Sequence, residues 1–397
     1  MDVAKYGGTQ NGGVNRQALS AEDIAARNHL VQWAHQRNFT ATQDAIGNLF
    51  VRREGQEPNL DPVMTGSHLD SQPTGGKFDG AYGVLAGLEV LDALNDAGVE
   101  SRRPVEVVAW TNEEGSRFSP GAMGSSVFAG IRELNSVLDV TDRSAVALRD
   151  ALAETLGAAE IDERLSQHAA GVHSYVEVHI EQGPVLEDAG LTIGVVTGIQ
   201  GVRRFEIDIS GEEAHAGTTP RGSRRDALAA AIVAIAELEK LTADDDDVLR
   251  FTVGRCEVSP GSPNTVPGHV HFTIDLRHPD EDVLRSLGNR IAKLVKEVTL
   301  PCNAITKDIS FFSPAIFAPK VVNVVRQSVE NLNIPHTSLP SGAGHDAMHM
   351  NEICPTGMVF VPCLNGVSHN EAESATPKDL ACGVRVLADT IATLAQE

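Results

Sequence analysis

Several features that mark particular classes of protein are scarce in this sequence. Aromatic residues make up 4% of the 397 residues, and 32 lysines and arginines face 54 aspartates and glutamates, a formal net charge of −22. Because nucleic-acid binding relies on basic grooves and stacked rings, this composition argues against a nucleic-acid partner. No apolar run reaches the roughly 18–20 residues of a membrane span, and the first residues lack the apolar segment of a secretory signal.

Cysteine is also scarce, and its distribution gives no disulfide framework. The five cysteines are odd in number and contain no C-x-x-C pair: Cys256, Cys302, Cys354, Cys363 and Cys382. This usage is typical of buried thiols in a reducing compartment. We therefore expect a cytoplasmic protein with neither a membrane nor a nucleic-acid partner. The acidic run at residues 244–247 is expected to be a solvated loop.

What the sequence does contain is a regular alternation of strand-like and helix-like segments, which is typical of α/β proteins. The chain is longer than the chains that usually fold around a single hydrophobic core, so we expect two domains. The strongest segments are strands at 63–67, 105–110, 175–179 and 357–361, and helices at 83–91 and 377–395. We expect these to form a large mixed sheet with helices on both faces, built from residues 1–199 and 313–397.

Residues 200–312 have a different pattern of strand-like and helix-like segments. The pattern is strand 202–210, helix 224–241, strands 250–258 and 270–276, helix 281–298 and strand 305–312. This β-α-β-β-α-β order is the ferredoxin-like motif. We therefore expect a small α+β domain inserted into the larger one.

Histidine and carboxylate patches follow the strands of the larger domain. Open α/β sheets bind ligands at the carboxyl ends of their strands, so we expect these patches to lie close together. One such histidine alone is more often a structural residue, but four patches at four strand ends form a mixed nitrogen and oxygen donor set suited to Zn²⁺, Mn²⁺, Co²⁺ or Ni²⁺. The candidate ligands are His68, Asp79, Glu114, His179 and His369. They exceed the usual ligands of one catalytic zinc, so two metals sharing one carboxylate are the simplest interpretation.

The pair Glu113–Glu114 comes directly after the strand that ends at Trp110. Adjacent side chains on a regular strand point to opposite faces, so both carboxylates can reach one site only where the strand breaks into a loop. One glutamate can then bind a cation while the other takes a proton from water.

These motifs resemble the hydantoinase/carbamoylase-family amidases, which include N-carbamoyl-L-amino-acid hydrolases, allantoate amidohydrolases and yeast-type β-ureidopropionases. The family lies within the binuclear-metal aminoacylase and carboxypeptidase superfamily. The resemblance runs from about residue 60 to 375 and is carried by GSHLDSQPTGGKFDG, TNEEGSRFSPGAMG, HIEQGPVLE, GEEAHAGTTP, NTVPG with DLRHP, SGAGHDA and FVPCLNGVSHNEAE. HIEQGP is the most discriminating, because peptidase relatives usually place a carboxylate where this chain has His179.

The resemblance implies a role for each residue of the metal centre. His68 and Glu114 would bind different metals, His179 and His369 would complete the two sites, and Asp79 would bridge them. Glu113 would be the general base, and Asp70 would orient His68. We expect His345 and Asp346 to be structural.

It also implies how substrate is held. His215, in the inserted domain, would polarise the carbamoyl oxygen, and Asn264 and Arg277 would hold the substrate carboxylate. Gln182 and the backbone at Gly342 and Gly344 would assist. In this family lid residues can come from the partner subunit, so the inserted domain would serve as a lid and as the contact of a homodimer.

The implied activity is hydrolysis of an N-carbamoyl-L-amino acid to the amino acid, ammonia and carbon dioxide. Allantoate, ureidoglycolate and N-carbamoyl-β-alanine are the alternative substrates, because each presents a ureido group beside a carboxylate. A peptidase is disfavoured by HIEQGP. A non-catalytic binding relative is disfavoured because Glu113 and all the candidate ligands are present.

Overall fold

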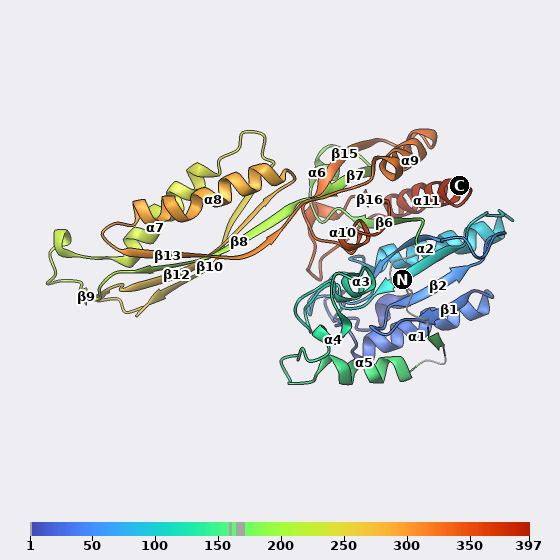
Figure 1. The fold of residues 1–397 in the computed structure, drawn as a ribbon, viewed down its shortest axis with the longest axis horizontal. Coiled ribbons are helices and arrows are strands. Elements are labelled where there is room, and N and C mark those ends of the chain that lie inside the picture. Colours follow the sequence, from blue (N-terminus) through green and yellow to red (C-terminus); the bar gives the residue numbers. More distant parts are fainter. Residues whose placement is uncertain (1, 159–160, 164–170) are drawn as a thin grey trace. The chain divides into compact units, whose positions relative to one another are not determined.

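The computed structural model describes residues 2–158, 161–163 and 171–397. The chain divides into two compact units, one made of Met1–Gly198 with Ile316–Glu397 and the other of Ile199–Ala315 (Figure 1). The boundaries expected from the sequence were 199/200 and 312/313. The predicted α/β class with an inserted α+β unit is confirmed.

The first unit is built on a mixed sheet whose strands run in the order β14-β7-β16-β6-β3-β4-β2-β1-β5, with β15 paired to β7 and β14 (Ala315–Ile316) as the edge strand. Strands β16, β6, β3 and β4 are mutually parallel, and β7 and β2 are antiparallel to their neighbours in this core. The strands are β1 (Thr40–Gln43), β2 (Leu49–Arg53), β3 (Val63–His68), β4 (Val105–Trp110), β5 (Asp162–Glu163), β6 (Ser174–Ile180), β7 (Ile193–Ile199), β15 (His336–Ser341) and β16 (Thr356–Val361).

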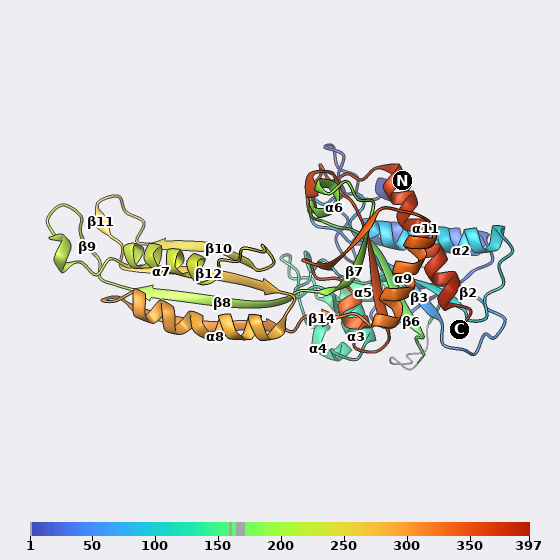
Figure 2. The same cartoon turned by 90° about the horizontal axis from the view of Figure 1, so that it is seen from above.

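Helices cover both faces of this sheet. Helices α2, α9 and α11 pack together over the parallel strands, whereas α1 packs on β1 and β2, and α3 and α10 lie against β4 and β6 (Figures 1 and 2). The helices of the unit are α1 (Ala21–Gln36), α2 (Ala81–Asp96), α3 (Met123–Phe128), α4 (Leu134–Val137), α5 (Leu148–Gly157), α6 (Val185–Asp188), α9 (Pro319–Asn331), α10 (Ala347–Met350) and α11 (Pro377–Leu394), with 3-10 turns η1 (Asp2–Lys5) and η3 (Leu364–Gly366).

The four parallel strands are buried along their whole lengths, β3 and β4 included. Strands covered on both faces carry continuous apolar runs, which is why 105–110 and 357–361 stand out in the sequence. Parallel strands also end at the same edge of the sheet. The residues that follow β3, β4, β6 and β16 are therefore brought to one place.

The second unit has the ferredoxin-like arrangement. Its antiparallel sheet has the order β10-β12-β8-β13, and α7 and α8 pack on the face that carries Phe205, Ile207 and Phe272. The elements are β8 (Gly201–Ser210), β9 (Ala214–His215), η2 (Arg221–Ser223), α7 (Ala227–Leu241), β10 (Arg250–Ser259), β11 (Thr265–Val266), β12 (His269–His278), α8 (Glu281–Val298) and β13 (Asn303–Phe312), with β14 (Ala315–Ile316) at the boundary.

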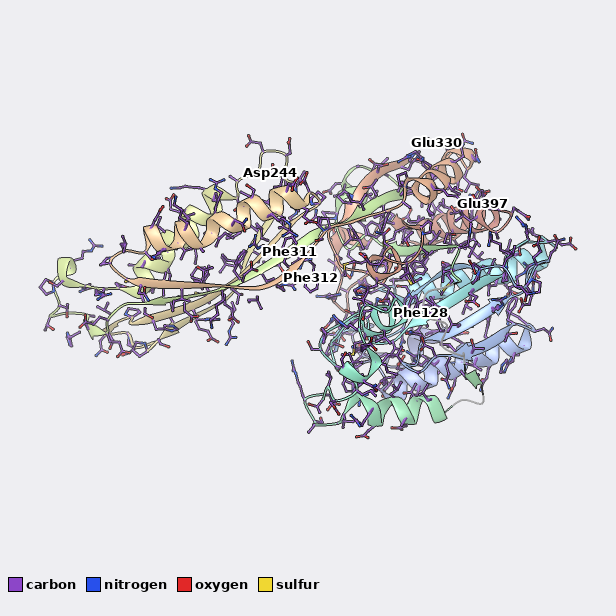
Figure 3. The ribbon with its side chains drawn as sticks, in the orientation of Figure 1. Phe128, Asp244, Phe311, Phe312, Glu330 and Glu397 are labelled. Carbon is purple, nitrogen blue, oxygen red and sulfur yellow. The ribbon has the colours of Figure 1, made fainter. Side chains whose placement is uncertain are left out.

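The acidic run after α7 is an exposed turn, as expected. The Asp244 carboxylate accepts hydrogen bonds from the backbone N–H groups of Val248 (2.7 Å) and Leu249 (2.8 Å), so it shapes the turn that leads into β10 (Figure 3). All five cysteines are free. Cys302, Cys354 and Cys363 are buried, Cys382 is partly buried, and Cys256 is exposed on β10, which the expectation of buried thiols did not anticipate.

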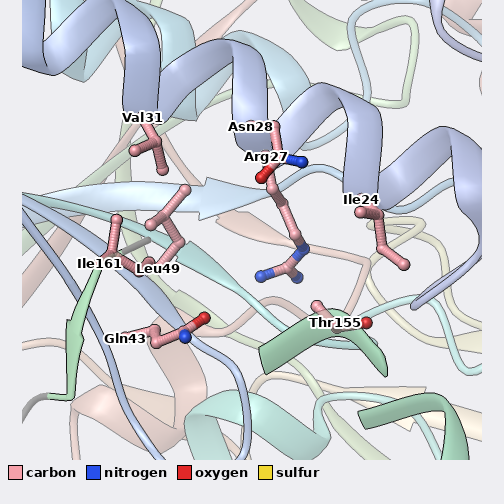
Figure 4. Close-up of a pocket in the computed structure, with 8 residues that line it drawn as sticks. All are labelled: Ile24, Arg27, Asn28, Val31, Gln43, Leu49, Thr155 and Ile161. Atoms are coloured by element: carbon pink, nitrogen blue, oxygen red, sulfur yellow. The ribbon is translucent and has the colours of Figure 1, made fainter. Parts of the chain in front are cut away.

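None of the described helices is long and apolar enough to cross a membrane. A small cavity of about 10 Å³ lies beside α1 in the first unit, lined by side chains that include Ile24, Arg27 and Thr155 (Figure 4). A volume of this size holds about one water molecule. It therefore gives no support for a ligand site there.

Gly66 allows β3 and β4 to approach each other. Its φ is +146°, and a Cβ added there would lie 2.0 Å from the carbonyl oxygen of Val108. We expect Gly66→Ala to destabilise the first unit by more than about 3 kcal/mol and to lower its Tm by roughly 6 °C or more. Gly157→Ala is the control, because a Cβ there meets no atom within 4 Å. Calorimetric unfolding tests this, and equal Tm values for the two variants would contradict it.

Candidate metal centre

The first candidate ligand is the last residue of β3. His68 is buried, and its ring lies against the backbone of Gly80, where a Cβ would come within 2.3 Å of the imidazole. Gly80 has a φ of +62°, a conformation that favours glycine. The glycine-rich loop can therefore fold over the ring, and it delivers Asp79 to the start of α2.

Asp79 lies at the centre of the cluster. Its Oδ1 is 3.2 Å from Nε2 of His179 and 3.7 Å from Nε2 of His68, and its Oδ2 is 3.3 Å from Nε2 of His369. His179 is on β6, and His369 follows β16 with a φ of +53°. One carboxylate thus faces histidines from three segments of the chain.

Glu114 joins the group on the Oδ2 side of Asp79. Its Oε2 is 3.3 Å from Nε2 of His369, and the backbone and side-chain N–H groups of Gln72 donate to its two oxygens at 3.1 and 2.8 Å. The potential ligand atoms fall into two groups that share Asp79, one with His68 and His179 and one with Glu114 and His369. The structure therefore brings together all the metal ligands expected from the sequence.

Glu113 lies beside these groups and belongs to neither. Its Oε2 is 3.4 Å from Nε2 of His68. The carboxylate of Asp70 accepts hydrogen bonds from the backbone N–H groups of both Glu113 (3.2 Å) and Glu114 (3.1 Å). These bonds hold the loop in which the two glutamates turn toward one site.

Asp70 contacts the His68 ring through its main chain. Nδ1 of His68 is 2.9 Å from the main-chain carbonyl of Asp70 and 4.0 Å from its carboxylate. The carbonyl is therefore the group of Asp70 that is placed to orient the imidazole, while the carboxylate holds the two N–H groups of the glutamate loop.

This buried cluster contains more carboxyl groups than groups that can carry a positive charge. Burial raises the pKa of Asp70 to about 6. Burial and neighbouring Asp79 raise the pKa of Glu114 to about 7, and burial with Asp346 and Glu114 raises the pKa of Glu113 well above its usual range. Burial opposes protonation of His179, but its hydrogen bond to Asp79 raises its pKa to about 9.

A divalent cation fits this environment. Several carboxylates are buried close together, and the imidazole nitrogens facing them are the donors that first-row divalent ions accept alongside oxygen. Nδ1 of His179 is hydrogen-bonded to the carbonyl of Ile180 at 2.9 Å, which leaves Nε2 directed at Asp79. Ligating histidines are commonly held in this way through their other nitrogen.

A third group of potential ligand atoms contains Glu177, His179 and His345. Glu177 already accepts from the Ser67 hydroxyl (2.7 Å) and from the backbone N–H of Ala347 (3.1 Å), so it ties β3 and α10 to β6. His345 is buried, Nε2 lies 3.0 Å from the Ser341 hydroxyl, and burial lowers its pKa well below the usual range. These contacts support a structural role for Glu177 and His345.

Asp346 is fully buried. Burial and the nearby Glu177 raise its pKa well above the usual range, and a hydrogen bond with the Ser125 side chain acts in the opposite direction. This burial is in keeping with a structural residue.

The expected substrate-binding residues of the first unit lie in two places. Nε2 of Gln182 donates to Oδ2 of Asp79 at 3.0 Å, so this amide contacts the cluster directly. Gly342 and Gly344 are exposed, and a Cβ on either would meet no atom within 4 Å. Their backbone therefore has open space beside it.

The expected residues of the second unit lie at opposite ends of its sheet. The backbone N–H of Ala216, next to His215, donates to the carbonyl of Asn264, because β9 and β11 form a two-stranded ribbon. That ribbon lies at the end of the unit where β12 begins (Figure 2). Arg277 is at the other end of β12, where its Nε donates to Asp275 at 2.7 Å.

Sequence reasoning missed Glu177 and Glu373, which are both buried behind candidate ligands. Glu177 did carry a signal, since it is two residues before His179 on a buried strand and so shares its face. Glu373 ends the motif FVPCLNGVSHNEAE, but two of its partners are the backbone N–H groups of Phe78 and Asp79, far away in the sequence.

Comparison with known proteins gives close matches over the whole chain. Residues 64–393 match the Peptidase family M20/M25/M40. An N-carbamoyl-L-amino-acid amidohydrolase of Rhizobium meliloti is 39% identical, covering 98% of this chain and 92% of the relative. A ureidoglycolate hydrolase of Arabidopsis thaliana is 35% identical, covering 99% and 84%. The crystal structure of a hydantoinase/carbamoylase-family amidase from Burkholderia multivorans has a TM-score of 0.95 and 44% identity, covering 100% and 96%.

The shared position of Asp79 predicts how substitutions change metal content. We expect the unsubstituted chain to hold about two divalent ions, His369→Ala to lose one of them, and Asp79→Ala to lose both, because only Asp79 belongs to both groups. Elemental analysis after dialysis against Mn²⁺ or Zn²⁺ measures this. His35→Ala, an exposed histidine of α1, is the control. Equal losses in the Asp79 and His369 variants would contradict the sharing.

Proposed function

We propose a function for this chain from its membership of the M20/M25/M40 peptidase family and, within it, of the hydantoinase/carbamoylase amidases. The chain hydrolyses the carbamoyl C–N bond of an N-carbamoyl-L-amino acid. The products would be the amino acid, ammonia and carbon dioxide. The observation that carries the proposal is the pair of ligand groups joined through Asp79, with Glu113 beside them and outside both.

We propose that the two groups hold two divalent ions, of which Zn²⁺, Mn²⁺, Co²⁺ and Ni²⁺ all suit the donors. When bound, they would supply Lewis-acid activation of a water molecule and of the ureido carbonyl. Glu113 takes a proton from the water that attacks the ureido carbon. As the C–N bond to the amino acid breaks, the same carboxylic acid returns the proton to the departing amine. The carbamic acid that is left decomposes to ammonia and carbon dioxide.

The substrate carboxylate is the second element of the proposal. Arg277 can form two parallel hydrogen bonds to a carboxylate, and Asn264 can donate from its amide. The eight residue steps from His269 to Arg277 span roughly 26 Å at about 3.3 Å per residue. One small carboxylate cannot contact Arg277 and Asn264 of the same unit. If both hold the substrate, they come from two copies of the chain, with His215 accompanying Asn264.

A surface on the second unit supports association of two copies. Ile232 and Val233 of α7 are 60% and 46% exposed although the helix is otherwise rich in alanine and leucine. Contiguous exposed apolar surface can mark a protein–protein contact. We therefore propose a homodimer formed through this unit.

Ureidoglycolate, or the related ureido acid allantoate, is the second candidate substrate. It is favoured by the Arabidopsis relative, whose name states ureidoglycolate hydrolysis and which matches 99% of this chain. Both substrate classes place a ureido group beside a carboxylate, so the same anchors serve either.

The role of Glu113 is tested by Glu113→Gln. This substitution removes the proton acceptor and preserves the side-chain shape, so we expect kcat to fall by about 10²–10⁴-fold with metal content unchanged. Ammonia release from N-carbamoyl amino acids, N-carbamoyl-β-alanine, allantoate and ureidoglycolate measures it, with exposed Glu133→Gln as the control. Full activity of the Glu113 variant would eliminate this residue as the base.

The composite substrate site is tested by mixing two inactive variants. Asn264→Ala and Arg277→Ala should each lose activity, but a heterodimer would contain one site with both residues intact. After random exchange of subunits, we expect about a quarter of unsubstituted activity. No recovery, with exchange verified by mass spectrometry of the intact dimer, would mean that both residues act from one copy.

A further inference from the structure

A buried carboxylate behind Asp79 has no part in the roles assigned above. Glu373 is only 5% exposed, and its Oε1 accepts hydrogen bonds from the backbone N–H groups of Phe78 (2.9 Å) and Asp79 (3.0 Å). It therefore fixes the main chain at the residue that both ligand groups share.

The other oxygen of Glu373 connects to the Asp79 side chain. The Ser368 hydroxyl is 3.0 Å from Oε2 of Glu373 and 3.1 Å from Oδ2 of Asp79, and Nε2 of Gln182 donates to that hydroxyl at 3.0 Å. Asp79 is thus held at its backbone directly by Glu373. The Ser368 hydroxyl lies between the two carboxylates and has one hydrogen, which it can donate to either of them.

The sequence leaves room for this contact at Gly76. A Cβ at Gly76 would lie 2.0 Å from the carboxyl carbon of Glu373, so any larger residue would push the glutamate away from the loop. The glycine-rich loop therefore has a second function besides its turn, which is to let a carboxylate approach its backbone.

Glu373 also belongs to the segment that carries His369. Its backbone N–H donates to the carbonyl of Asn370 at 3.0 Å, which closes a turn directly after the left-handed His369. Glu373 thus joins the Asp79 loop to the His369 loop. His68 and His179 have separate supports, since each is held through Nδ1 by a nearby main-chain carbonyl.

We propose that Glu373 is a positioning residue that holds Asp79 and His369 in register, and so sets the affinity of the Asp79–Glu114–His369 group for its metal ion. The proposal rests on the proposed function in one respect, namely that this group binds a metal. Burying a further carboxylate beside Asp79 costs free energy, and its three hydrogen bonds offset that cost.

The test is titration of the metal-free chain with Co²⁺ or Mn²⁺, with bound metal measured spectroscopically and by elemental analysis. We expect Glu373→Ala to weaken the binding of the ion at the Asp79–Glu114–His369 group by about 10–100-fold. The ion at His68 and His179 should be weakened less, because it shares Asp79 but its two histidines keep their own supports. Because Asn264 and Arg277 make no contact with Glu373 among the hydrogen bonds of the described residues, kcat should fall at limiting metal and recover in excess metal.

Glu373→Gln should restore most of the affinity. Its amide oxygen can still accept from the two backbone N–H groups, and its amide N–H can donate to the Ser368 hydroxyl, whose hydrogen then points to Asp79. Glu371→Ala is the matched control from the same segment, because its exposed carboxylate bonds to Asn11 at 2.7 Å and makes no contact with Asp79 among the hydrogen bonds of the described residues.

The outcomes separate this proposal from the proposed function. An unsubstituted chain that binds no metal would overturn the proposed function. If Glu373→Ala binds both ions with the same affinities as the unsubstituted chain, the role of Glu373 alone is overturned. The same holds if Glu373→Gln binds metal as weakly as Glu373→Ala. If Glu373→Ala does not fold, Ser368→Ala is the variant to measure instead. It should weaken the binding of the ion at the same group, Asp79–Glu114–His369.

Discussion

Everything in the candidate metal centre depends on one shared carboxylate. Oδ1 of Asp79 faces His68 and His179, and its Oδ2 faces His369 and the side chains of Gln182 and Ser368. No regular element could aim one side chain at so many partners. The glycine-rich loop between β3 and α2 does so, because Gly80 packs its backbone against the His68 ring.

Charge is the second constraint. The chain carries an excess of acid, and most of it lies on the surface, where a turn such as the one at Asp244 uses it for local structure. Several carboxylates are instead buried at the ends of parallel strands, where the pKa values of Asp70, Glu113 and Glu114 are all raised. Cations bound there would balance these charges and would also reverse the local field that an anionic substrate meets.

The sequence predicted the fold class, and it predicted which polar side chains come together, because these side chains follow the apolar runs of the parallel strands. Apolar runs marked β3, β4, β6 and β16, and parallel pairing brought the polar residues after them to one edge of the sheet. Contacts of side chains with the backbone could not be predicted from the sequence. The N–H partners of Asp70 and Glu373 come from distant segments and leave no periodic pattern. The distance between Asn264 and Arg277 likewise could be inferred only once the length of β12 was known.

The most direct test of this account is anomalous scattering from crystals of the chain grown with Mn²⁺ or Zn²⁺. The account predicts two peaks about 3.5–4 Å apart, one near His68 and His179 and the other near Glu114 and His369. Each should lie about 2.0–2.2 Å from an oxygen of Asp79. A single peak, or two peaks that Asp79 does not join, would contradict it.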